Sequence, residues 1–93
     1  MKIKVLKSFS LKLADQVEYI AEDKPQAARK FKKDILKTIK ELEALPYKHR
    51  KSIYFDDENI RDLVFKGYTI VYRVKPKEEC IEVFGLLKYE DKL

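Results

Sequence analysis

The chain has 93 residues, 45% of them hydrophobic, and a formal net charge of +5. This length supports one hydrophobic core, so we expect a single domain over residues 1–93. No run of 18 apolar residues is present and the N-terminus alternates charged with apolar residues, which excludes a membrane anchor and a signal peptide and predicts a soluble, cytoplasmic protein. Cys80 is the only cysteine, so an internal disulfide and a multi-cysteine zinc site are excluded.

A strand and then a helix are expected in the first quarter of the chain. Charged and apolar side chains alternate over residues 2–7, which is the period of a strand. Apolar residues then recur every three or four positions, and Ser8 or Ser10 can cap a helix at its N-terminus. We expect this helix to end near Asp23.

A second helix is predicted to begin at Pro25, because the missing N–H of proline costs nothing in a first helical turn. Its apolar stripe extends to Leu45, and Pro46 marks its end. The periodicity then fails, and we expect an ordered loop that contains a short strand at Ser52–Phe55.

Three strands are predicted in the last third of the chain. Residues 60–65, 68–75 and 80–87 are rich in β-branched and aromatic residues with a period of two. Lys66-Gly67 is a two-residue hairpin connection. The chain is therefore predicted to be an α+β domain, in which an N-terminal strand and a two-helix hairpin precede a three-stranded antiparallel meander, with the helices packed on one face of the sheet.

The positive charge is concentrated in the middle of the sequence. Ten basic and three acidic residues lie between Lys24 and Lys51, a net of +7, whereas the other 65 positions sum to −2. A localised basic surface favours a polyanion or an acidic protein as partner, although a solvated helix face has the same pattern. The candidate residues for binding nucleic acid or another target are Arg29, Lys33, Lys37, Lys40, Lys48, His49, Arg50 and Lys51.

The order and spacing of four segments resemble the RelE/ParE superfamily of bacterial toxins over nearly the whole chain. None of them is specific alone; they are Tyr19–Ala28, Leu42–Pro46, Ile60–Leu63 and Gly67–Val74. The resemblance implies the toxin half of a type II toxin–antitoxin module, of the kind that stabilises plasmids, which arrests growth and is neutralised by a cognate antitoxin.

Two activities occur on this superfamily fold, so the fold does not choose between them. RelE-like members are mRNA interferases that cleave mRNA on the ribosome without a metal, and ParE-like members inhibit DNA gyrase. The Asp23–Ala28 junction and the Ile60–Leu63 strand favour the ParE branch. Thr69 also favours the ParE branch. It directly follows Gly67-Tyr68, and ribonuclease members commonly have an arginine at the corresponding position. An inactive member that only binds its antitoxin is the third alternative.

Ribonuclease activity would need groups that activate a ribose 2′-hydroxyl, stabilise the phosphorane and protonate the leaving oxygen. The candidates for these roles are Arg61, Arg73, Lys88 and Tyr89. Alternatively, the two arginines reach the rim of the sheet and pair with Asp62 or Glu82. His49 is the only histidine, and no glycine-rich phosphate-binding loop is present, so we expect neither a metal site nor a small-molecule cofactor.

Antitoxin binding is assigned to aromatic side chains of the sheet. An apolar pocket rimmed by positive charge suits an acidic amphipathic peptide. The candidate antitoxin-binding residues are Phe65, Tyr68, Tyr72 and Phe84.

Overall fold

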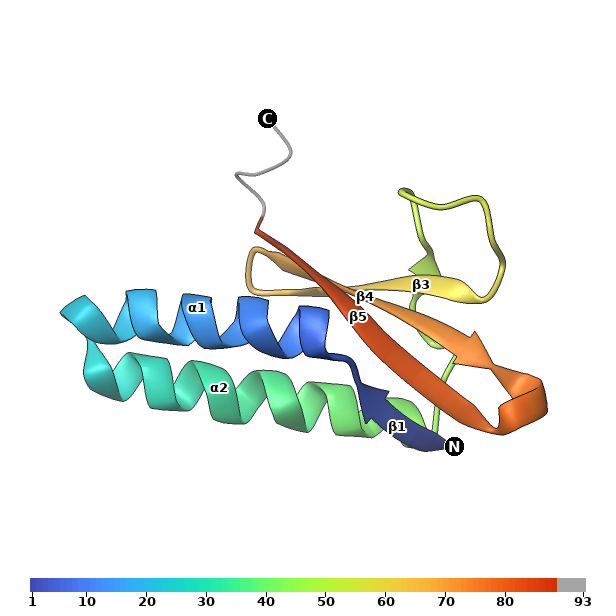
Figure 1. The fold of residues 1–93 in the computed structure, drawn as a ribbon, viewed down its shortest axis with the longest axis horizontal. Coiled ribbons are helices and arrows are strands. Elements are labelled where there is room, and N and C mark those ends of the chain that lie inside the picture. Colours follow the sequence, from blue (N-terminus) through green and yellow to red (C-terminus); the bar gives the residue numbers. More distant parts are fainter. Residues whose placement is uncertain (89–93) are drawn as a thin grey trace.

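The computed structural model describes residues 1–88, which form two helices and a five-stranded mixed sheet (Figure 1). The strand order is β1-β5-β4-β3-β2, with β1 parallel to β5 and the other pairs antiparallel. This arrangement confirms the predicted α+β class. The elements are β1 Lys2–Val5, α1 Lys7–Asp23, α2 Pro25–Lys40, β2 Arg50–Lys51, β3 Ile60–Phe65, β4 Tyr68–Lys75 and β5 Cys80–Lys88, with 3₁₀ turns at Glu41–Glu43 and Pro76–Glu78.

The first helix, α1, begins without a side-chain cap. Leu6 precedes it in an extended conformation, and neither predicted serine caps the helix. Ser8 instead donates a hydrogen bond from Oγ to the carbonyl oxygen of Phe84, 2.8 Å away. The prediction of a capping serine was therefore wrong, because this hydroxyl ties the helix to β5.

The second helix starts at Pro25 as predicted, but its α-helical part ends at Lys40. A 3₁₀ turn follows, and within it Leu42 is still buried in the core. Leu45 is exposed. The apolar stripe thus continues past the α-helix, because the 3₁₀ turn keeps Leu42 against the core. The predicted helix, which extended to Leu45, was too long.

The three predicted strands are confirmed, and so is the hairpin turn between β3 and β4. Lys66 and Gly67 have φ values of 45° and 82°, the left-handed pair that a two-residue type I′ turn requires. The short strand was predicted in the wrong place, because β2 is Arg50–Lys51. Ser52 begins a turn instead: its Oγ accepts a hydrogen bond from the Tyr54 N–H.

The core lies between the helix hairpin and one face of the sheet (Figure 1). Its largest fully buried side chains include Phe9 of α1, Ile35 of α2 and Tyr72 of β4. The segment 52–58, called the 52–58 loop from here on, meets the opposite face, where Phe55 packs edge-on against Phe84 at 5.7 Å between ring centroids. The two faces of the sheet therefore have different surroundings, which decides where each candidate residue can act.

Candidate functional site

Arg61 lies on the helix-facing side of β3, directly across from Tyr72. Its Nε donates to the carbonyl oxygen of Glu58 at 2.9 Å, and its Nη1 donates to that of His49 at 3.2 Å. The guanidinium also stacks over the ring of Tyr47, 4.9 Å from the centroid. Only 18% of the side chain is exposed. Arg61 therefore holds the segments on either side of β2 together.

Arg73 points to the opposite face of the sheet. Its Nη1 lies 3.4 Å from Oε1 of Glu82, its cross-strand neighbour in β5. The guanidinium also lies over the ring of Phe84, 5.1 Å from the centroid. The predicted ion pair with Glu82 is confirmed for Arg73, whereas Arg61 pairs with Glu58 and not with Asp62.

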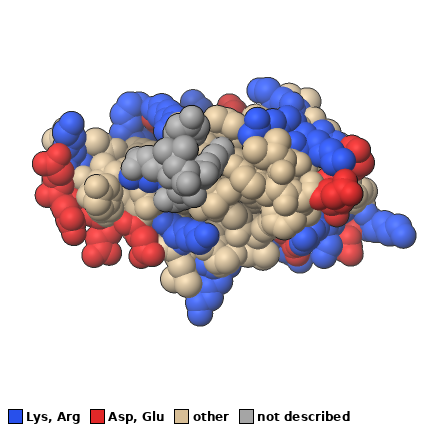
Figure 2. All heavy atoms as spheres, turned by 90° about the horizontal axis from the view of Figure 1, so that it is seen from above, with Lys and Arg blue, Asp and Glu red and all other residues tan. Residues whose placement is uncertain are grey.

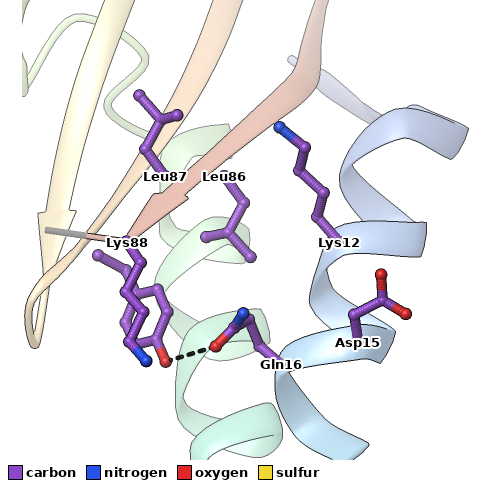
Figure 3. A pocket seen from close by; sticks show the side chains of 7 residues that line it. Lys12, Asp15, Gln16, Leu86, Leu87 and Lys88 are labelled. Atoms are coloured by element: carbon purple, nitrogen blue, oxygen red, sulfur yellow. Dashed lines mark hydrogen bonds between the residues drawn. The ribbon is translucent and has the colours of Figure 1, made fainter. Parts of the chain in front are cut away.

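Lys88 ends β5 beside a small pocket of about 210 Å³ (Figure 3). Its Nζ lies 5.0 Å from the ring centroid of Tyr19. The Tyr68 hydroxyl donates to Oε1 of Gln16 at 3.0 Å, which ties β4 to α1 within the pocket (Figure 3). The remaining predicted ribonuclease residue, Tyr89, lies outside the described residues.

The three described ribonuclease candidates do not meet. Arg61 and Arg73 face opposite sides of the sheet, as the alternation along β3 and β4 requires. In the register of β4 with β5, Lys88 lies opposite Tyr68. Tyr68 is five residues from Arg73 along β4, so Lys88 and Arg73 are separated by about 16 Å at the usual strand rise. These residues therefore cannot surround one phosphodiester in this structure.

The basic residues of α2 form a continuous exposed stripe on the side away from the core. Their spacing of four, four and three residues places them on one face of the helix. None of them forms an ion pair with any residue in the described part of the chain. This surface is called the α2 stripe from here on and comprises Arg29, Lys33, Lys37 and Lys40.

The second basic group, at β2, is partly neutralised within the molecule. Arg50 pairs with the buried Asp62, at 3.6 Å. Lys51 pairs with Asp56 at 3.4 Å and Glu58 at 3.5 Å, and its hydrogen bond to Asp56 is the main reason that its pKa is raised. In Figure 2 acidic side chains gather at the end where α1 meets α2, and the two signs of charge lie together at the other end. The α2 stripe is the less neutralised of the two basic groups.

His49 is half-buried, with its ring edge-on to that of Tyr72 at 6.3 Å between centroids. Burial lowers the pKa of His49 below its usual 6.5, and the charge of Lys48 acts in the same direction.

The lowered pKa predicts a loss of stability in acid. A histidine that binds its proton less readily when folded contributes stability above pH 6.5, and this stability disappears as the pH falls below 6.5 through the folded pKa. We expect the thermal midpoint to fall more between about pH 7.5 and about pH 5 in the wild type than in His49→Gln. An NMR titration midpoint for the His49 ring at or above 6.5 would contradict this prediction.

The four predicted antitoxin-binding aromatics do not form one exposed pocket. Phe65 and Tyr68 pack on Phe31 of α2, with centroid distances of 6.2 and 5.0 Å. Tyr72 is completely buried, and its hydroxyl donates to the carbonyl oxygen of Pro46 at 2.7 Å. Phe84 lies on the other face, at an irregularity in the pairing of β4 with β5. Strand alternation and this irregularity separate the four rings.

The sequence reasoning treated Asp62 as a surface carboxylate, but the structure buries it. Its Oδ2 accepts a hydrogen bond from the Ile53 N–H at 3.1 Å and lies 3.6 Å from Nη2 of Arg50. Its Oδ1 is buried without a hydrogen-bond partner within residues 1–88. The available signal was an acidic residue in the middle of an apolar strand, which is unusual in a buried position.

The family model for the ParE toxin of type II toxin–antitoxin systems matches residues 3–92. The chain belongs to this family. No curated protein matches the sequence. Because the family consists of toxins of type II toxin–antitoxin systems, the partner of this ParE-family toxin is a cognate antitoxin. Within residues 1–88, no helix is long and apolar enough to cross a membrane, and no group of three or more His, Cys, Asp or Glu side chains could hold a metal ion.

Proposed function

We propose that the toxin arrests growth by binding and inhibiting DNA gyrase, without catalysis, and that its cognate antitoxin neutralises it. The observation that carries this proposal is the separation of Arg61, Arg73 and Lys88. General acid–base chemistry needs its groups within hydrogen-bonding reach of one substrate. Two of these residues lie on opposite faces of the sheet, and the third lies near one end of it. An inhibitor that acts by binding needs no such convergence.

The α2 stripe is the surface that we assign to the target. It stands on a helix whose other face is anchored in the core by Phe31 and Ile35. Its side chains are not neutralised by described carboxylates, in contrast to Arg50 and Lys51. Binding of such a basic helix surface to an acidic partner should weaken as the salt concentration rises.

The proposal predicts inhibition of supercoiling by purified gyrase. The toxin is added to gyrase, ATP and relaxed plasmid, and supercoiled product is followed on a gel. We expect Lys33→Glu combined with Lys37→Glu to raise the inhibitory concentration about tenfold, because each reversal removes a favourable contact and adds a repulsive one. Lys2→Glu combined with Lys4→Glu is the matched control, since it makes the same charge change on β1 and should have little effect.

Arg73→Ala separates this proposal from the ribonuclease alternative. It should leave gyrase inhibition and growth arrest unchanged, since the ion pair of Arg73 with Glu82 and its ring contact with Phe84 lie on the sheet and not on α2. In growing cells, uptake of labelled thymidine should stop before uptake of labelled amino acids. An early block of translation with cleaved transcripts, abolished by Arg73→Ala, would contradict the proposal. Absence of any growth arrest would instead indicate an inactive member of the family.

A further inference from the structure

A groove of about 420 Å³ with a mostly apolar floor runs along the helix hairpin. Its lining includes Leu13 and Val17 of α1, Leu36 of α2 and Val5 of β1. Leu36 is 40% exposed, although an apolar side chain of this size is usually buried in a helix that packs on a core. No described segment of the chain covers this groove.

The two walls of the groove carry opposite charges. Glu18 lines it from α1 and Lys32 lines it from α2. Neither side chain forms an ion pair with a described residue. The same asymmetry extends along the helices, because α1 contains two basic and four acidic residues, whereas α2 contains six basic residues and one acidic residue.

We propose that a second copy of this chain covers the groove. Two hairpins can pack face to face about a two-fold axis parallel to their helices, so that α1 of each copy lies against α2 of the other. Every neighbouring pair in the resulting four-helix arrangement is then antiparallel, as in common helix bundles. A two-fold axis also makes each contact occur twice, so Glu18 faces Lys32 of the second copy at two places.

Charge complementarity favours a second copy because its surface has the required pattern: an acidic wall, an apolar centre that includes Leu36, and a basic wall. Eight residues line the groove, fewer than the roughly 20–30 that each partner contributes to a standard protein interface. We therefore expect a weak dimer, with a dissociation constant in the micromolar range. The proposal concerns the toxin alone and does not depend on gyrase being the target.

Sedimentation equilibrium of the purified full-length chain, over about 1 to 200 µM, tests the dimer. We expect a reversible dimer. Leu36→Glu should raise its dissociation constant at least about tenfold, because it places a charge in the apolar centre of the interface. Leu45→Glu is the matched control and should leave the constant unchanged, since Leu45 is an exposed leucine that does not line the groove. Circular dichroism checks that both variants are folded.

Mixing two charge-reversal variants tests the orientation. Glu18→Lys gives a groove with two basic walls and Lys32→Glu gives one with two acidic walls, so each variant alone should dimerise about fivefold more weakly or worse. An equimolar mixture should form heterodimers tighter than either homodimer, because all pairs are then complementary. A monomer at every concentration, as expected if the antitoxin or another partner is the occupant, overturns the proposal. So does a dimer that tolerates Leu36→Glu, or a mixture with no preference for heterodimers.

Discussion

Replacing Tyr72 with alanine is expected to destabilise the toxin by about 3–5 kcal/mol, the range for removing a large aromatic side chain from a core. Tyr72 has no exposed surface and belongs to the core cluster between helices and sheet. Domains of this size are stable by only about 5–15 kcal/mol, so a substantial share of the stability would be lost. The free energy of unfolding, from urea denaturation followed by circular dichroism, measures the effect.

Tyr72→Phe separates the hydroxyl from the ring. It keeps the ring but removes the hydrogen bond to Pro46, and should cost about 1 kcal/mol. Tyr19→Ala is the control for tyrosine truncation, because Tyr19 is 62% exposed and should change stability little. If Tyr72→Ala proved no more harmful than Tyr19→Ala, the placement of Tyr72 in the core would be wrong.

Alkaline pH gives a second test of the same residue. Burial raises the pKa of Tyr72 to about 12, above its ordinary 10.0. Because the unfolded chain then loses this proton more readily than the folded one, the associated stability is full below pH 10 and disappears as the pH rises through about 12. Tyr72→Phe should remove this part of the alkaline destabilisation.

Much of the fold could be predicted because its signals are local. Pro25 begins α2, and the Lys66-Gly67 pair forms the left-handed turn that joins β3 to β4. The position of β2 was missed because two residues carry no periodicity and pair with β3 through contacts that are distant in sequence. The register between strands, which places Arg61 across from Tyr72, is likewise a tertiary property.

The candidate site was harder to predict than the fold. Alternation along one strand places Arg73 on the face opposite Tyr72, but the relation of Arg61 and Lys88 to that face requires the register of three strands. The irregular pairing near Phe84 changes which β5 side chains share a face. Gly85 lies beside it and is the residue type that often accompanies a bulge, but one glycine does not tell which side chains change face. The exposed α2 stripe, by contrast, follows directly from helical periodicity, which places its four basic side chains on the side away from the core.

Asp62→Ala is expected to release the 52–58 loop from the sheet. The substitution removes the acceptor of the Ile53 N–H and the ion-pair partner of Arg50. A lost hydrogen bond to a charged group costs about 1.5–3 kcal/mol of stability. Part of this cost is offset, because the substitution also removes Oδ1, a buried oxygen that has no hydrogen-bond partner within residues 1–88. We expect faster cleavage by chymotrypsin after Tyr54 or Phe55, measured by mass spectrometry of the fragments under native conditions.

Asp56→Ala is the matched control, because Asp56 is a fully exposed carboxylate of the same loop that pairs with Lys51. Exposed ion pairs contribute little, so its cleavage rate should resemble that of the wild type. Equal resistance of Asp62→Ala and the wild type would show that the buried carboxylate does not hold the loop. The α2 stripe lies on the helix layer and not on the loop, so the proposed function also predicts that folded Asp62→Ala inhibits gyrase normally. Loss of inhibition in a folded Asp62→Ala protein would move the target surface from α2 to the 52–58 loop.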